Sequence, residues 1–298
     1  MAPDPTIRQM GEDALVGRLL PLMPANESLV TGPGDDCAVA RVSPGRQLLL
    51  KTDCVVEGMH FLPGTEPELI GRKALARAVS DVGAMGGVPL HALVTLLIHA
   101  DRPVSQVEGI YRGMKKLAEQ FGISVAGGES SGLPEDGLII SVALTGEVPD
   151  GKAVLRNTAQ RGDLIAVTGV LGGSFPTGHH LSFTPRVSEG GFLAASGLVT
   201  AMMDLSDGLG TDLPRLAAAS GLGFRVREEL LPVREGFTTE QAAGDGEDYE
   251  LLMTFPPAHR DQLARLAAER FPETPLTVIG EMTTAPSSGL PAGYSHFN

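Results

Sequence analysis

The stretch from Leu90 to Ala126, LHALVTLLIHADRPVSQVEGIYRGMKKLAEQFGISVA, decides the fold class. Leu90–Ile98 is an apolar run of strand length, and Ser124–Ala126 is a second, shorter one. Between them, over Ser105–Phe121, apolar residues recur on one helical face, and this segment opens on the capping-box sequence SQVE. A strand, a helix and another strand in this order predict an α/β or α+β fold.

The same alternation of apolar strand-length runs and helical periodicity continues on both sides of this stretch. The expected helices are Thr65–Met85, Leu213–Ala219 and Ala258–Arg270, and the expected strands are Gln47–Lys51, Leu138–Gly146, Leu164–Thr168, Phe224–Val226, Tyr249–Phe255 and Leu276–Gly280.

The chain of 298 residues is about twice the commonest domain size, so we expect two domains. The polar and basic segment Pro149–Gly162 has the composition of a hinge, which sets the expected domains at residues 1–149 and 150–298. Gly169–Gly191 is rich in glycine, proline and histidine and has little periodicity, so it is expected to form a loop over the site.

Composition narrows the class of protein. The formal net charge of −13, with scattered Lys and Arg, argues against a nucleic-acid partner. The apolar run Leu90–Ile98 is too short to cross a bilayer, and Met1–Gly17 lacks the pattern of a signal peptide. Two cysteines, Cys37 and Cys54, build no disulfide framework and are expected to be small buried residues beside a site. These features predict a cytoplasmic protein without membrane contact.

Three acidic segments stand where apolar runs give way to small residues: Gly34-Asp35-Asp36, Lys51-Thr52-Asp53 and Asp204-Leu205-Ser206-Asp207-Gly208. Carboxylates brought close together repel one another unless a counter-charge is present. Hard divalent cations, and the phosphates that they carry, are suitable counter-charges. The segments therefore indicate a site for a nucleotide with Mg²⁺. Walker-type and Cys/His metal motifs are missing from the sequence, so side-chain carboxylates would have to build it.

Each acidic feature also has a structural interpretation. Asp81, in a helix of small residues, either pairs with Lys73 or Arg77 or shares a metal ion with Asp36. Asp204 and Asp207 have the spacing of a helix N-cap and a first-turn acid, although two acids and a hydroxyl exceed what capping needs.

Two further motifs carry a weaker signal. The glycine-rich segment 127–132 offers backbone N–H groups to a phosphate. The pair His179 and His180 is expected to be solvated loop residues rather than metal ligands.

In order and spacing, several segments together resemble the thiamine-monophosphate kinase family, within the superfamily of aminoimidazole ribonucleotide synthetase and selenophosphate synthetase. They are GDDCAV at 34–39, TDCVVEGMHF at 52–61, KALA at 73–76, SD at 80–81, AMGG at 84–87, Arg156, GD at 162–163, DLSDGL at 204–209, GEDYEL at 246–251 and GYSHF at 293–297.

The resemblance implies an N-terminal α/β domain that dimerises through its sheet, a C-terminal α/β domain, and ATP bound mainly by the N-terminal domain through several Mg²⁺ ions. It also implies transfer of the γ-phosphoryl group of ATP to the phosphate of thiamine monophosphate. Such a loose transfer needs charge neutralisation and in-line positioning more than it needs a strong base.

The resemblance assigns functions residue by residue. The implied metal ligands are Asp36, Thr52, Asp53, Asp81, Glu129, Asp204 and Asp207. The implied ATP contacts are Gly128, Glu129, Arg156, Ser206 and Tyr111, the implied substrate contacts are His60, Glu247 and Tyr294, and Asp207 and Arg156 are implied in catalysis.

The chain departs from the family pattern at two informative places. Glu129 stands where the family has an aspartate, and Lys51 stands where the family has a small residue, so that its ammonium group could take one metal position. These departures keep two alternatives open: a related ATP-dependent enzyme acting on another small acceptor, and a nucleotide-binding protein without turnover.

Overall fold

The computed structural model describes residues 5–10, 12–31, 39–40, 43–288 and 290. The chain divides into two compact units. Unit 1 comprises Met1–Val82 and Val88–Asp150, and unit 2 comprises Gly83–Gly87 and Gly151–Asn298. The boundary in the second half of the chain lies at the start of the polar segment 149–162, whereas the five residues Gly83–Gly87 join unit 2 although they are early in sequence.

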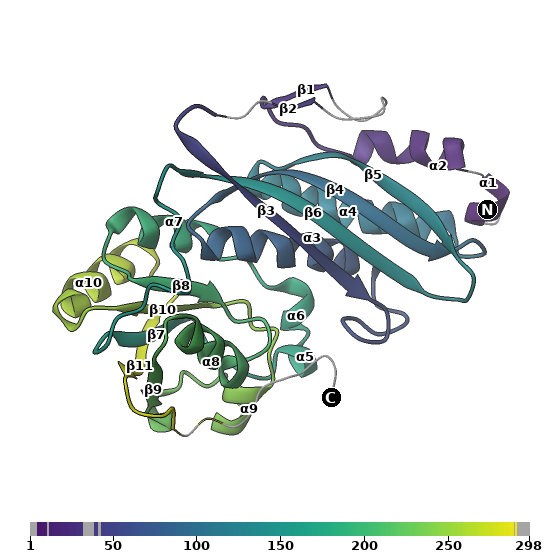
Figure 1. Cartoon of the computed structure of the whole chain (residues 1–298). Coiled ribbons are helices and arrows are strands. Elements are labelled where there is room, and N and C mark those ends of the chain that lie inside the picture. Colours follow the sequence, from purple (N-terminus) through teal and green to yellow (C-terminus); the bar gives the residue numbers. More distant parts are fainter. Residues whose placement is uncertain (1–4, 11, 32–38, 41–42, 289, 291–298) are drawn as a thin grey trace. The chain divides into compact units, whose positions relative to one another are not determined.

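Unit 1 is a four-stranded sheet with helices on one face (Figure 1). The strand order is β3-β6-β4-β5, with all pairs antiparallel except β4 with β5. The parallel pair is joined by α4, which is the strand–helix–strand unit predicted from the 90–126 stretch. The bounds are β3 Arg46–Val56, α3 Pro67–Ala84, β4 Val88–His99, α4 Val104–Phe121, β5 Ser124–Leu133 and β6 Leu138–Pro149, preceded by α1 Ile7–Met10, α2 Glu12–Leu19, the 3₁₀ turn Leu20–Leu22, β1 Leu29–Thr31 and β2 Val39–Ala40.

The two faces of this sheet differ in burial. Val55, Val94 and Val142 are fully buried. Their neighbours on the opposite face include Leu50 and Leu93, which are 76% and 48% exposed. Side chains of a strand alternate between the faces, so one face packs on α3 and α4 while the other presents apolar surface in the single chain.

Unit 2 is a five-stranded antiparallel sheet of order β8-β10-β7-β11-β9 between two helical layers. One core packs α8 and α9 on the sheet, and the other packs α7 and α10 on it. The bounds are β7 Leu164–Thr168, α5 Ser174–Thr177, α6 His179–Ser182, α7 Val187–Ser196, β8 Ala201–Asp204, α8 Leu209–Ala219, β9 Gly223–Val226, the 3₁₀ turn Glu228–Leu230, α9 Thr239–Gly244, β10 Leu251–Phe255, the 3₁₀ turn Pro257–His259, α10 Arg260–Arg270 and β11 Leu276–Thr283.

Three expectations about local structure are wrong. The segment 169–191 is not a loop, because it contains α5, α6 and the start of α7, separated by left-handed glycines such as Gly178. Helix α4 begins at Val104 with Pro103 as its N-cap, so SQVE lies one residue inside the helix and makes no capping box. Cys54 is exposed, because it lies on the face of β3 that the helices do not cover.

None of the helices in the described part of the chain is long and apolar enough to cross a membrane.

Candidate active site

In unit 1, two predicted metal ligands form one charged cluster. Lys51 Nζ lies 2.8 Å from Asp81 Oδ2 and 3.9 Å from Asp53 Oδ2. Arg77 Nη2 lies 3.3 Å from Asp53 Oδ1, and Arg77 Nη1 donates a 2.8 Å hydrogen bond to the carbonyl of Cys54. Two carboxylates therefore share two cations.

Strand and helix periodicity build this cluster. Lys51 and Asp53 are two residues apart on β3 and so point to the same face, and Arg77 and Asp81 are four residues apart on α3. Burial raises the pKa of Asp81, and the neighbouring Lys51 ammonium partly offsets that rise. The structure forms an ion pair at Asp81, with Lys51 as the partner in place of Lys73 or Arg77. The metal ion shared with Asp36 stays a prediction, because Asp36 lies outside the described residues. Lys73 instead donates to the carbonyl of His60 at 2.5 Å.

Thr52 and Glu129 lie elsewhere on the sheet. Thr52 faces away from Asp53 because neighbours on a strand alternate, and it is exposed. Glu129 pairs with Thr95, which pairs with Ser141, which in turn pairs with Cys54, so Glu129 shares the face of Cys54. Glu129 also lies on the edge strand opposite β3, about 14 Å away at ~4.8 Å per strand. One chain does not bring Glu129 to Asp53 and Asp81.

The remaining predicted positions of unit 1 have clear structural functions. His60 is buried, and its Nδ1 accepts a 3.1 Å hydrogen bond from the backbone of Val56, which leaves the proton on Nε2 in the neutral ring. Gly128 is required by packing, since an added Cβ would lie 1.8 Å from the carbonyl oxygen of Val94.

Tyr111 is only 3% exposed, and burial raises its pKa to about 12. Its position on the buried face of α4 gives it a core function, and we leave it out of the proposed nucleotide site.

In unit 2, two segments that are far apart in sequence are joined at the backbone. The N–H of Glu247 donates to the carbonyl of Ser206 at 2.7 Å, and the N–H of Tyr249 donates to that of Leu205 at 2.8 Å. Glu247 and Tyr249 have positive φ angles of 56° and 52°, which non-glycine residues rarely adopt. Ser174 Oγ fixes the same turn by donating to the carbonyl of Glu247 at 2.5 Å. Strained backbone held in this way is typical of functional sites.

The acidic segment 204–208 is stabilised by a carboxylate that sequence reasoning did not assign to the site. Asp212 Oδ2 accepts hydrogen bonds from the backbone N–H groups of Ser206 at 3.0 Å and Asp207 at 2.9 Å. Arg215 Nη1 then bridges Asp207 at 2.5 Å and Asp212 at 3.0 Å. Asp212 is fully buried, and burial raises its pKa to about 6. The i, i+3 and i, i+8 spacings of Arg215 to these acids were the signal available in the sequence.

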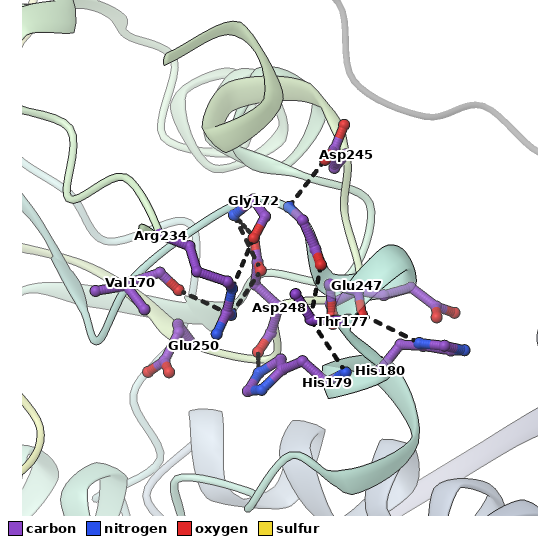
Figure 2. Close-up of polar contacts among 12 residues, drawn as sticks. Val170, Gly172, Thr177, His179, His180, Arg234, Asp245, Glu247, Asp248 and Glu250 are labelled. Carbon is purple, nitrogen blue, oxygen red and sulfur yellow. Dashed lines mark hydrogen bonds and ion pairs between the residues drawn. The ribbon is translucent and has the colours of Figure 1, made fainter. Parts of the chain in front are cut away.

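Two buried carboxylates that follow Glu247 in sequence, those of Asp248 and Glu250, bind groups of other segments (Figure 2). Both carboxylate oxygens of Asp248 accept from the N–H of Gly172, at 3.1 and 3.0 Å, and Arg234 lies 3.6 Å away. Burial raises the pKa of Asp248 to about 7. Glu250 accepts two hydrogen bonds from the guanidinium of Arg186, at 2.8 and 2.5 Å.

The two adjacent histidines also belong to this region. His179 Nε2 lies 3.2 Å from the carbonyl of Asp248. His180 is buried, its ring stacks on Phe175 with 4.2 Å between centroids, and its Nδ1 lies 3.1 Å from the carbonyl of Ser174. The expectation of two solvated loop residues is therefore wrong for His180, because α6 turns its ring into the fold.

Arg156 lies apart from Asp207 within unit 2. Its side chain is exposed, and its carbonyl accepts from Ser220, which follows α8, whereas Asp207 precedes α8. The 11-residue helix separates them by about 16 Å at ~1.5 Å per residue. Asp204, by contrast, is buried at the end of β8 and adjoins the 205–208 turn.

Among the described residues, no group of three or more His, Cys, Asp or Glu side chains has the arrangement of a metal site. Asp53 and Asp81 are paired with Lys51 and Arg77, and Asp207 is paired with Arg215. Two predicted site residues, Asp36 and Tyr294, lie outside the described part of the chain.

Comparison with known proteins shows the family to which the chain belongs. The chain matches the family models "AIR synthase related protein, N-terminal domain" over residues 34–148 and "AIR synthase related protein, C-terminal domain" over residues 160–292. The chain belongs to this family of two-domain α/β proteins.

Within it, the chain belongs with the thiamine-monophosphate kinases. It is 31% identical over 303 residues to thiamine-monophosphate kinase of Bacillus subtilis (strain 168), covering 92% of this chain and 93% of that one. The crystal structure of thiamine-monophosphate kinase from Stenotrophomonas maltophilia K279a superposes with a TM-score of 0.79 at 30% identity, covering 94% and 96% of the two chains. AaThiL complexed with AMPPCP and TMP gives a TM-score of 0.75 at 31% identity, covering 97% and 98%.

Proposed function

We propose that this protein transfers the γ-phosphoryl group of ATP to the phosphate of thiamine monophosphate, giving thiamine diphosphate and ADP. Similarity over nearly the whole length to kinases of this name supports the reaction, as does a related structure that holds AMPPCP, an ATP analogue, together with TMP. The observation that carries the proposal for this chain is the backbone junction of Ser206 with Glu247, which joins a predicted nucleotide contact to a predicted substrate contact.

In unit 2, the proposed functions belong to the residues on either side of the backbone hydrogen bond between Glu247 and Ser206. Ser206 and Asp207 are presented at the start of α8, where Asp212 holds their N–H groups, and Glu247 is held at a fixed angle by its left-handed backbone. We assign Asp204 and Asp207 as the acidic residues that would hold Mg²⁺, and Glu247 as a substrate contact. When bound, Mg²⁺ would neutralise the charge that develops on the phosphoryl oxygens.

Within unit 1, we assign His60 as a substrate contact, Gly128 as a nucleotide contact, and the Asp53–Asp81 cluster as the acidic part of the nucleotide site. Arg156, an exposed cation of unit 2, is a proposed ATP contact. Asp36 and Tyr294 stay predictions from the family resemblance, and so does the cytoplasmic location.

We further propose that the protein is a homodimer formed through the open face of the unit 1 sheet. Leu50 and Leu93 are large apolar side chains on that face and are 76% and 48% exposed in the single chain. Exposed apolar patches of this kind mark interaction surfaces. Because Thr52 and Glu129 lie on that face and on opposite edges of the sheet, a second copy is the natural means of bringing such residues into one site.

The test is ADP release from ATP with thiamine monophosphate, compared with thiamine, other phosphate monoesters and small carboxylic acids as acceptors. We expect thiamine monophosphate to give the highest kcat/KM and Glu247→Gln to lower it at least tenfold. The exposed Glu240→Gln in α9 serves as the control. Faster turnover with another acceptor would show that this acceptor is the substrate. ATP binding without ADP release for any acceptor would show a nucleotide-binding protein without turnover.

A further inference from the structure

The Asp53–Asp81 pair of unit 1 differs from an open metal site in one respect: a cation of the chain itself lies between the two carboxylates. We propose that the ammonium group of Lys51 is the resident cation of this pair and takes the position that a divalent ion would otherwise hold there. The inference deepens the proposed function, since it concerns the number of metal ions that the ATP site uses.

The distances carry the first step. Lys51 Nζ is 2.8 Å from Asp81 Oδ2, which is hydrogen-bond contact, and 3.9 Å from Asp53 Oδ2. A divalent ion bridging the two carboxylates would need these same oxygen atoms at its own shorter ligand distances. The ammonium and the ion therefore compete for one place.

Charge carries the second step. Asp53 and Asp81 contribute two negative charges, and Lys51 and Arg77 contribute two positive ones, so the charges of these four described side chains balance. Mg²⁺ gives up its water ligands reluctantly and binds where anionic oxygens are in excess. These four side chains, with an ammonium group beside both carboxylates, supply no such excess.

Access carries the third step. The side chains of Lys51, Asp53 and Asp81 keep 31%, 18% and 28% of their surface exposed, so metal ions in solution can reach the pair. Whether a metal ion occupies the position between Asp53 and Asp81 is therefore decided by Lys51 and not by burial. Arg77 is anchored separately through the carbonyl of Cys54, so removing Lys51 leaves the position of Asp53 defined.

The experiment counts bound Mn²⁺ by electron paramagnetic resonance in nucleotide-free protein, a readout independent of turnover. We expect Lys51→Ala to bind one more Mn²⁺ per chain than the parent, Lys51→Arg to match the parent, and Lys51→Ala/Asp81→Asn to weaken the added site at least tenfold. The exposed Lys152→Ala is the matched control and should match the parent. An equal count in the parent and Lys51→Ala overturns the proposal.

A second variant keeps the test decisive if Lys51→Ala does not fold. Asp81→Asn in the otherwise intact protein removes one carboxylate of the pair while Lys51 stays. We expect its Mn²⁺ count to equal that of the parent, because the parent holds no metal ion there. Loss of one Mn²⁺ would show that a metal ion displaces Lys51 and would overturn this inference. The proposed kinase reaction would still stand, because it does not depend on this result.

Discussion

At the scale of single residues, Asp212 is the clearest case of one side chain that holds the site in place. Its Oδ2 accepts two backbone N–H groups, those of Ser206 and Asp207, inside the fold. Asp212→Ala leaves both donors without this acceptor, and we expect the free energy of unfolding to fall by about 2–4 kcal/mol. Asp261→Ala, at an exposed first-turn acid of α10, should change it by less than ~0.5 kcal/mol. Urea denaturation measures both, and equal effects would contradict this function of Asp212.

The raised pKa of the buried Asp248 carboxyl group predicts that the stability of the protein depends on pH. Burial raises its pKa to about 7, above its ordinary value of 3.8, so the folded state binds more protons than the unfolded state between these values. Its contribution to stability is therefore full below about pH 4 and is lost as the pH rises to about 7.

Asp248→Asn does not titrate, so the parent should lose stability relative to this variant between pH 5 and pH 8. At about 1.4 kcal/mol per pKa unit, the loss is on the order of 1–3 kcal/mol. Thermal melts at the two pH values measure it. Asp245→Asn, at an exposed carboxylate of the same turn (Figure 2), should keep the pH dependence of the parent. A constant difference between the parent and Asp248→Asn would exclude Asp248 as the titrating group.

Sequence reasoning at this scale found the acidic positions but not their partners. A spacing rule selected Lys73 and Arg77 for Asp81, yet Asp81 pairs with Lys51 from another element. That pairing depends on how α3 packs on β3, and the local periodicity of either segment does not predict this packing. Asp212 and its partner Arg215 were missed for a different reason. An acid in the first turn of a helix is already explained by its favourable interaction with the helix N-terminus, so Asp212 gave no sign of a further function.

At the scale of elements, α3 and α4 touch through glycines. A Cβ added at Gly113 of α4 would lie 1.9 Å from the carbonyl oxygen of Glu68, whereas one added at Gly17 of α2 would meet nothing within 4 Å. Helix propensity alone favours alanine at both positions by up to about 1 kcal/mol. We expect Gly113→Ala to destabilise the protein by about 1–3 kcal/mol because the helices must separate, and Gly17→Ala to be neutral or stabilising. Chemical denaturation of the two variants checks the difference in sign.

Long periodic elements were predictable, and short ones were not. The segment 90–126 folds as expected because eighteen residues of one amphipathic helix, α4, repeat the same signal. The prediction for segment 169–191 was wrong because its helices α5 and α6 have four residues each. Four residues are about one turn, which is too short for a helical period to appear. Strand β8 was missed for the same reason: its four buried residues, AMMD, do not alternate.

At the scale of the whole molecule, the uncovered face of the unit 1 sheet predicts the oligomeric state. We expect a homodimer by light scattering at micromolar concentration, and Leu50→Lys should shift it to monomer, because it places a charge in an apolar interface. Leu155→Lys is the control, since Leu155 is 42% exposed in unit 2. A parent protein that is monomeric at this concentration would contradict the proposed dimer.

The separation of Glu129 from Asp53 leads to the last prediction. Asp53 lies on one edge strand of the sheet and Glu129 on the other, about 14 Å apart at ~4.8 Å per strand, so a site that uses both would take Asp53 from the edge of one copy and Glu129 from the other copy. We expect Glu129→Gln and Asp53→Asn to be inactive alone: the first loses a predicted ligand, and the second loses the carboxylate that holds Lys51 and Arg77.

Unfolding and refolding the two variants together should restore about a quarter of the parent activity, because half of the dimers are mixed and each mixed dimer has one intact site. Refolding each variant separately is the control. If the site lies within one chain, mixing restores nothing. If Glu129→Gln alone turns over thiamine monophosphate as fast as the parent, Glu129 lies outside the site, and the kinase must rely on its aspartates and on Lys51.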